Sequence, residues 1–393
     1  MGLGRAVFTG LFTCIGSFLF GYDSGIITST IAQTNFIKVF KNPSPASQGG
    51  IVSAYTGGAV VGCVVVYYIG DRLGRKRSIF IGAWTAILGC ALQAGAVNIP
   101  MLIVGRLITG IAVGIMSTIN PVYCAEVAPP AWRGTIAGFQ QLMVSFGFLF
   151  AQWIGYGCSF ANDSFQWRFP LAFQLIPALV LGIGIPFQLE SPRWLIMQDR
   201  QSEAVVVLRK LHFNGHNENF LNLEYCEIRD AIAAEQALSV RSWKQMISTG
   251  PWRRRLYLAC GLQLSSQLSG VNVINYYGPR IYSALNFGLQ ESLLIIGING
   301  ALSVCETALG FVVVDKIGRV KPLIVGAFGM AFALLVEAVL ASTIDANPTP
   351  SSNQNALRAS VAMNSVFSVF FTPVGIIGWV SPIRTSLILG LSK

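Results

Sequence analysis

The amino-acid sequence predicts an all-α membrane protein with about ten spans, and two observations carry that prediction. Of its 393 residues, 53% are hydrophobic and only 11% are charged, and the mean hydropathy is +0.59. Soluble domains carry roughly a quarter charged residues, so this composition excludes an ordinary cytosolic enzyme. Apolar stretches of about 20 residues, the length of a helix that crosses hydrocarbon, also recur along the chain with polar breaks between them.

Ten apolar stretches are long enough to be spans, and one long polar segment divides them. We expect spans at residues 6–32, 50–70, 78–97, 100–123, 136–158, 171–189, 254–277, 292–314, 322–342 and 358–380. The first lacks a small-residue cleavage site, so we interpret it as a retained span rather than a secretory signal. Charge-rich runs with helical spacing at 203–210 and 223–236 predict short helices in the polar segment. The expected organisation is a six-span bundle at 1–190, a linker at 191–252 and a partial bundle of about four spans at 253–393.

Basic residues are distributed unevenly between the two sides of the membrane. With the N-terminus inside, 21 of the 27 Lys and Arg residues fall on the cytoplasmic side, and Arg106 falls within a span. The positive-inside rule therefore predicts a multi-pass protein with a cytoplasmic N-terminus. The net charge of +10 is then loop charge beside the lipid bilayer, so we expect no nucleic-acid partner.

The cysteines and histidines predict no metal site, cofactor or disulfide. None of the eight cysteines belongs to a CxxC pair, and six lie in apolar runs typical of small buried hydrophobes. His212 and His216 are four residues apart, but Gly215 lies between them and no third ligand is near in the sequence. An enzyme would need convergent His, Cys or carboxylate groups, so we expect no catalytic site.

A short charged motif occurs twice, at equivalent points of the two halves. Residues 71–77 (DRLGRKR) join the second and third spans, and residues 315–321 (DKIGRVK) join the eighth and ninth. The glycine permits a tight turn, the arginines can pin neighbouring helix ends, and the aspartate can cap or pair them. Ordinary cytoplasmic loops would explain the basic residues but not the repeated D-x-x-G-R spacing. The repeat predicts a duplicated transporter bundle.

Seven motifs occur in the order typical of one transporter family. They are GYDSG at 21–25, the two D-x-x-G-R loops, Gly105-Arg106, PVYCAE at 121–126 with WRG at 132–134, ESPRWL at 190–195, and QLSGVN at 267–272 with Tyr276-Tyr277. On these motifs the chain resembles the sugar porter family of the major facilitator superfamily, in particular its fungal members. The resemblance implies two pseudo-repeated six-helix bundles that rock about a central sugar site, in the plasma membrane.

The sequence departs from that family in its second half. Only four expected spans follow the linker, whereas members of the family continue through a Glu and an Arg-Gly element into two further spans. Arg384 stands where the acidic residue is expected after Trp379. A truncated product, an alternative transcript and a faulty gene model all remain open. We expect an incomplete second bundle and a chain that transports poorly or not at all.

Charged residues inside spans are costly and need a reason. Asp23 and Arg106 lie at similar depth in the outer half of their spans, so they can form an ion pair. Protonation of Asp23 would weaken the pair and bias the opening equilibrium, and the resemblance assigns proton coupling to the same two positions. A static structural pair is the alternative. Glu306 lies near the midplane, where a second proton site is conceivable, and Glu337 lies closer to the outer end of its span.

A sugar site needs uncharged amides that donate and accept hydrogen bonds, together with an aromatic face. By resemblance, the substrate-binding residues are Gln141, Gln267, Asn272, Asn299 and Trp379. Ser303 is the alternative to Asn299, because the spacing to Asp315 admits either alignment. Ser266 replaces the first glutamine of the usual pair, which puts an ordinary hexose preference in doubt.

Charged residues at the cytoplasmic helix ends form an expected inner gate. The set comprises Asp71, Gly74, Arg75, Glu126, Arg133, Glu190, Arg193, Asp315 and Arg319. Screened surface pairs are individually weak, so such a network would be easily broken during cycling.

We interpret the chain as a secondary active transporter that moves a sugar by alternating access and proton symport. Its expected partners are a monosaccharide or a related polyol, acid or disaccharide, protons and the bilayer, and its oligomeric state is left open. The alternatives are a facilitative sugar uniporter, a non-transporting sugar sensor and an inactive truncated product.

Overall fold

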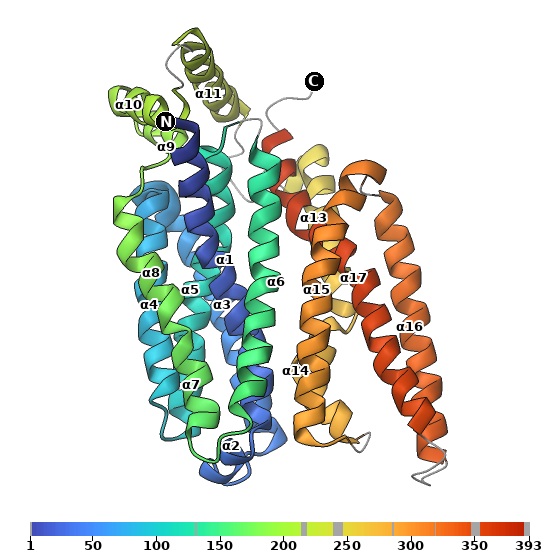
Figure 1. Ribbon diagram of the computed structural model, residues 1–393. Helices are drawn as coiled ribbons and strands as arrows, with labels where there is room; N and C mark the ends of the chain where they lie inside the picture. Colours follow the sequence, from blue (N-terminus) through green and yellow to red (C-terminus); the bar gives the residue numbers. More distant parts are fainter. Residues whose placement is uncertain are drawn as a thin grey trace.

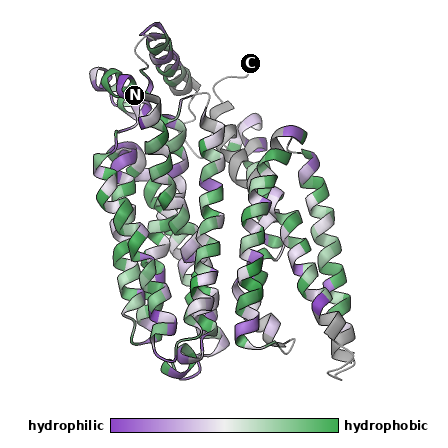
Figure 2. Cartoon of the chain, viewed as in Figure 1, coloured by the Kyte–Doolittle hydropathy of each residue, from purple (hydrophilic) through white to green (hydrophobic). Residues whose placement is uncertain are grey.

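The computed structural model of the chain describes residues 2–129, 132–213, 218–238, 247–284, 287–318, 320–346 and 354–388. Regular structure among these residues is helical throughout, which confirms the predicted fold class. Eight helices of this part of the chain are long and apolar enough to cross a membrane. Figure 2 shows hydrophobic residues along the length of the long helices and hydrophilic residues gathered toward their ends.

The first half contains six of these eight helices. They are α1 (Gly2–Ala32), α3 (Pro45–Leu73), α4 (Arg75–Ala94), α5 (Ile99–Val127), α6 (Arg133–Cys158) and the joined pair α7 (Phe165–Phe173) and α8 (Leu175–Gly184). Local sequence sets several starts: the Ser44 hydroxyl accepts the Ser47 N–H before α3, and the Asn98 side chain accepts the Met101 N–H before α5. The sixth span begins about six residues before its expected start at 171, because its apolar face continues back to Phe165.

Close backbone contact holds α1 against α6. A Cβ atom at Gly21 would overlap the carbonyl oxygen of Val144, and one at Gly147 would overlap the carbonyl oxygen of Phe18. Between membrane helices, association depends on van der Waals packing, which small residues permit at short range. The contact fixes the height of α1, and with it the position of Asp23 two residues along.

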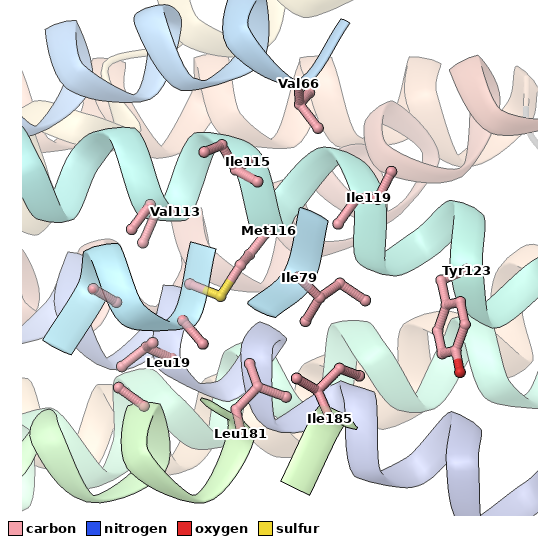
Figure 3. Packing of buried hydrophobic residues seen from close by; sticks show 14 of the residues in the cluster. Leu19, Val66, Ile79, Val113, Ile115, Met116, Ile119, Tyr123, Leu181 and Ile185 are labelled. Carbon is pink, nitrogen blue, oxygen red and sulfur yellow. The ribbon is translucent and has the colours of Figure 1, made fainter. Parts of the chain in front are cut away.

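Apolar side chains fill the interior of the first half. Leu19 of α1, Ile79 of α4, Met116 of α5 and Leu181 of α8 are fully buried and belong to one cluster. Figure 3 shows these side chains interdigitating between the helices. The interior is therefore close-packed, and polar groups within it have fixed surroundings.

Three helices follow the first half at one end of the molecule. They are α9 (Pro192–Met197), α10 (Gln201–His212) and α11 (Glu218–Leu238), and the last two match the helices expected at 203–210 and 223–236. They lie at the same end as the N-terminus, which we call the linker end (Figure 1). The opposite end carries the short α2 (Thr34–Val39) and is called the far end.

The second half contains α13 (Gly250–Leu268), α14 (Val271–Ala284), α15 (Leu289–Ile317), α16 (Val320–Ala346) and α17 (Gln354–Ile388). One expected span, 254–277, is broken into α13 and α14, so the continuous helix predicted there is wrong. Gly270 lies at the break with φ +83°, a left-handed conformation that glycine adopts without strain. Beside the break, the Ser269 hydroxyl donates to the Ser266 carbonyl at 2.7 Å. This is an ordinary length for a hydrogen bond from a hydroxyl, about 2.8 Å.

The two halves meet along two pairs of helices. Helix α6 lies beside α15, where the hydroxyls of Ser145 and Thr307 are 2.8 Å apart (Figure 1). Helix α1 contacts α14 toward the far end, where the Thr28 hydroxyl donates to the Asn275 carbonyl at 2.8 Å. These contacts frame a space between the halves.

Candidate functional site

A cavity of about 300 Å³ lies between the two halves. Its walls come from α1 and α6 on one side and from α13, α14, α15 and α17 on the other. Amide and hydroxyl side chains dominate the polar part of the lining, and phenylalanines supply the aromatic part. The volume is at the lower end of the range typical of small-molecule sites.

Four of the five expected substrate-binding residues line this cavity. Gln141 comes from α6, Gln267 from α13, Asn272 from α14 and Asn299 from α15. Ser303, the alternative to Asn299, lines it as well, so the structure does not separate the two alignments. The side chain of Trp379 lies outside the described residues.

Sequence reasoning missed further polar residues of the lining. These are Ser145, Gln152, Gln263, Asn275, Tyr282, Thr307, Asn364, Ser368 and Thr372. A signal was present, because Asn299, Ser303 and Thr307 recur at four-residue spacing on a mostly apolar helix, as do Asn364, Ser368 and Thr372. Residues four apart share one helix face, so each row predicts a polar stripe that avoids lipid.

Hydrogen bonds to neighbouring side chains orient the amides of the lining. The Asn272 side-chain NH₂ donates to the Gln267 side-chain oxygen at 2.6 Å, across the break between α13 and α14. The Tyr282 hydroxyl accepts from the Asn364 NH₂ at 2.9 Å. The Asn299 oxygen accepts from the Ser365 hydroxyl at 2.7 Å. Each amide keeps further donor or acceptor capacity, so the wall can both give and take hydrogen bonds.

A fully buried ion pair joins α1 to α5 in the first half. The Arg106 Nη1 atom is 2.7 Å from Asp23 Oδ1 and also donates to the Asp23 carbonyl oxygen at 3.2 Å. Both side chains are 0% exposed. The guanidinium carbon lies 4.4 Å from the centre of the Tyr55 ring, a cation–π contact, and the Tyr55 hydroxyl bonds with Ser24. The structure thus brings together the two residues expected at equal depth.

Several polar atoms of the Asp23–Arg106 pair make no hydrogen bond to the residues that the structure describes. Within the described part of the chain, Asp23 Oδ2 and Arg106 Nε and Nη2 are buried and have no hydrogen-bond partner. A single Nη1 contact is weaker than the two-pronged arrangement that Arg and a carboxylate can form. Asp23 Oδ2 is therefore an open acceptor that a proton can occupy.

At the linker end, Arg75 connects three helices. Its Nε and Nη2 atoms bond both oxygens of Glu126, at 3.0 and 3.1 Å, and its Nη1 atom lies 3.0 Å from Asp71. Arg75 and Glu126 are each less than a tenth exposed, whereas Asp71 is mostly exposed. The first motif repeat is thereby tied to the end of α5.

Glu190 attaches the start of α4 to α9. Its Oε1 atom accepts from the backbone N–H groups of Lys76 and Ser191, at 3.2 and 3.0 Å. Burial raises the pKa of Glu190 above its ordinary value, and these N–H groups and Arg75 offset that rise only in part. Gly74 has φ +92°, and a Cβ there would lie 2.8 Å from Glu190 Oε2. Glycine is therefore required for the conformation and for the close approach of the carboxylate.

The remaining residues of the expected gate belong to α6, α9 and the second repeat. Arg193 lies on α9, and Gly318 of the second repeat has φ +85°, close to that of Gly74. Arg319 lies outside the described residues, and so do the side chains of Arg133 and Asp315. The contacts that the structure does describe for Asp71, Arg75, Glu126 and Glu190 lie within the first half and α9.

His212 is a buried structural residue that sequence reasoning did not place. Its Nδ1 atom is 2.8 Å from Glu224 of α11, and its Nε2 atom is 3.1 Å from the carbonyl of Val127 at the end of α5. His216 lies outside the described residues. The histidine thus joins the linker helices to the first half.

Comparisons with known proteins identify relatives of this chain. The chain matches the family described as "Sugar (and other) transporter" over residues 9–382. It is 39% identical to the MFS-type transporter criB of Aspergillus cristatus, over 97% of this chain and 81% of that protein. It is 31% identical to a high-affinity glucose transporter of Kluyveromyces lactis, over 94% and 70%, and 33% identical to a D-xylose transporter of Levilactobacillus brevis, over 96% and 79%.

A solved structure shares the fold. The xylose transporter XylE from E. coli, in a partially occluded inward-open conformation, superposes with a TM-score of 0.78 at 24% identity, over 98% of this chain and 88% of that one. The fold is therefore that of the major facilitator superfamily. Because the family match covers nearly all of the chain, the protein is a multi-pass membrane transporter, not an enzyme, and it belongs to the sugar (and other) transporter family.

Proposed function

We propose that the protein carries a monosaccharide or a related polyol across a membrane together with a proton. The amide-lined cavity between the two halves is the observation that carries this proposal. Sugar hydroxyls both donate and accept hydrogen bonds, so they suit Gln and Asn side chains better than fixed charges. The glucose and xylose transporters among the relatives support the same substrate class.

Both halves contribute to the proposed substrate site. Gln141 belongs to the first half, whereas Gln267, Asn272 and Asn299 belong to the second. A substrate held by both would draw the halves together, and its release would let them separate. The substrate would then make more contacts in the closed state than in the open state, and alternating access requires such a difference.

The Asp23–Arg106 pair is the proposed proton site. A proton on Asp23 would remove the charge that Arg106 compensates and weaken the link between α1 and α5. Helix α1 also contacts α14 of the second half through Thr28, so a shift of α1 can reach the contact between the halves. Proton binding would therefore change the free-energy difference between the open and closed states.

The proposed orientation places the linker end in the cytoplasm. The excess of Lys and Arg near that end supports it through the positive-inside rule, and we propose the plasma membrane as the host. In this orientation the Arg75 network and Glu190 belong to the inner gate, as do the second-repeat residues Asp315 and Arg319.

Uptake by the purified full chain in proteoliposomes tests the proposal. Labelled D-glucose, D-xylose and a polyol are compared with and without an inward proton gradient. We expect saturable binding of at least one of them, and accumulation of the same compound, where it is measurable, only under the gradient. Absence of both binding and uptake for the whole panel would contradict the substrate assignment.

Asp23→Asn separates symport from facilitated uniport. We expect this variant to exchange labelled for unlabelled substrate while it no longer accumulates substrate under a proton gradient. Asp163→Asn, which alters an exposed carboxylate in the loop between α6 and α7, is the matched control and should behave as wild type. Accumulation by Asp23→Asn would make the buried pair a static structural feature, and wild-type uptake that ignores the gradient would favour uniport.

A further inference from the structure

A second acidic residue lies inside the membrane-spanning part of the protein. Glu306 lies on α15, about 16 Å from the linker end of that helix at 1.5 Å per residue. Its Oε2 atom accepts hydrogen bonds from two hydroxyls of α17, Ser368 at 3.0 Å and Thr372 at 3.1 Å. Its Oε1 atom is buried and has no hydrogen-bond partner among the residues that the structure describes.

No described cation compensates Glu306. Four helices pack against α15, and each carries at least one titratable side chain that the structure describes. They are Tyr156 and Cys158 on α6, Tyr276 and Tyr282 on α14, Lys321 and Glu337 on α16, and Arg358 on α17. Within the described ranges, none of these groups forms a hydrogen bond or ion pair with Glu306. An uncompensated carboxylate at membrane depth is costly, so this environment favours a site that exchanges a proton.

The hydroxyls around Glu306 can be arranged in two ways. When Glu306 is ionised, Ser368 and Thr372 both direct their hydrogens to Oε2, and only their lone pairs remain for other groups. When Glu306 holds a proton, its own O–H donates to one of these hydroxyls, whose hydrogen is then released. Thr372 has an alternative acceptor for that hydrogen, the Ser368 carbonyl at 3.0 Å.

Both hydroxyls line the cavity, whereas Glu306 lies behind them. The proton state of Glu306 therefore changes the hydrogen-bond donors that this part of the wall can offer. With Glu306 ionised, the wall accepts hydrogen bonds from a substrate hydroxyl, and with Glu306 protonated it can also donate one. Thr307, the next residue along α15, contacts Ser145 of the first half, so the switch lies beside a contact between the halves.

We propose that Glu306 is a proton-binding site of the second half, and that its proton sets whether Ser368 and Thr372 donate or accept hydrogen bonds toward a hydroxylated substrate. The effect on substrate rests on the proposed function, whereas the proton site does not. The reaction is reversible binding of one proton through the cavity, and no covalent bond of the substrate changes.

Infrared difference spectroscopy tests the proton site without any substrate. The purified full chain in lipid is titrated with acid, and the carbonyl band of protonated carboxyl groups is recorded. We expect one component of that band to be present in wild type and in Asp23→Asn, and to be missing both in Glu306→Gln and in the double variant Asp23→Asn with Glu306→Gln. Glu291→Gln, which changes an exposed carboxylate in the first turn of the same helix, should keep that band. A band unaffected by Glu306→Gln would overturn the proposal.

A pair of hydroxyl variants covers the case in which Glu306→Gln does not fold. Ser368→Ala with Thr372→Val keeps the carboxyl group and removes both of its hydrogen-bond donors. We expect the band to move to the frequency of a carboxyl group with fewer hydrogen bonds. An unmoved band would show that these hydroxyls do not contact the titrating group, which contradicts the proposal.

Binding of D-glucose and D-xylose, followed by tryptophan fluorescence as pH varies, tests the effect on substrate. In the Asp23→Asn background we expect affinity to keep a pH dependence of about two- to tenfold, the size of one hydrogen bond gained or lost. Adding Glu306→Gln should abolish it, and a persistent dependence would contradict the proposed switch. If no sugar binds to any variant, the proposed function fails, while the infrared band still decides whether Glu306 binds a proton.

Discussion

The two halves of the transporter bury an acidic side chain in different ways. In the first half, Asp23 lies against Arg106, and the pair is fully enclosed. In the second half, Glu306 is surrounded by hydroxyls, and the described residues provide it with no cation. A carboxylate at membrane depth must be compensated or neutralised. The first half compensates its acid with a charge, whereas in the second half the neutralising group that we propose is a proton.

Two close helix contacts, one in each half, differ in what the glycine touches. In the first half, Gly21 of α1 faces the backbone of α6, where no atom can move aside without moving the helix. In the second half, Gly329 of α16 faces the ring of Phe370 on α17, a side chain that can rotate. The contact at Gly21 is therefore expected to tolerate less change than the contact at Gly329.

Removal of Arg106 should have the largest effect on stability. Arg106→Met leaves Asp23 buried without its counter-charge, and we expect a loss of about 3–5 kcal/mol, measured by thermal or denaturant unfolding of the detergent-solubilised protein. The double variant Asp23→Asn with Arg106→Met should recover most of that loss, because no buried charge then remains. If the double variant is as unstable as Arg106→Met, the cost comes from packing against Tyr55 rather than from charge.

Glycine substitutions test the difference in helix contacts. Gly21→Ala should destabilise the protein by about 1–3 kcal/mol, because its Cβ meets a backbone carbonyl. Gly329→Ala should cost less, since the Phe370 ring can move. Gly157→Ala of α6 is the control, with open space around its Cβ, and should be neutral or slightly stabilising in a helix. Equal costs at Gly21 and Gly329 would contradict the proposed difference between these two contacts.

Substrate affinity reports whether both halves contact the substrate. Gln141→Ala in the first half, and Gln267→Ala or Asn272→Ala in the second, should each weaken binding by about 1–3 kcal/mol, or five- to a hundredfold, because a desolvated substrate hydroxyl loses its partner. Ser266→Gln should change the preference among sugars. The measurement is equilibrium binding to folded protein, and an effect confined to one half would show that the other does not bind the substrate.

The smallest expected effect concerns pH at the linker end. Because the pKa of Glu190 is raised in the folded protein, the folded state binds a proton more tightly than the unfolded state between the ordinary value of 4.5 and the raised value. This contribution to stability is present below 4.5 and is lost as pH rises through that window. Glu190→Gln should remove this component from a plot of melting temperature against pH. A wild-type profile in Glu190→Gln would show that Glu190 does not titrate in this way.

Much of the fold follows from the sequence. Nine of the expected spans coincide with single long helices or, at 171–189, with the joined pair α7 and α8. The tenth, at 254–277, is two helices, because apolar composition does not reveal a break whose cause is one glycine in a left-handed conformation. The site was predicted in part: Gln141, Gln267, Asn272 and Asn299 meet at one cavity, whereas Asn364 and Tyr282 were not expected there.

The sequence by itself determined the membrane class, the places of most long helices and the duplicated motif, because hydropathy and residue spacing are local properties of the chain. Only the tertiary structure decided which polar groups meet. Asp23 and Arg106 are 83 residues apart, and Glu306 and Ser368 are 62 apart. A carboxyl group is compensated by the groups that helix packing places within about 3 Å of it. Helix packing is set by close contacts such as that of Gly21 on α1 with α6, which depend on the residues of both helices.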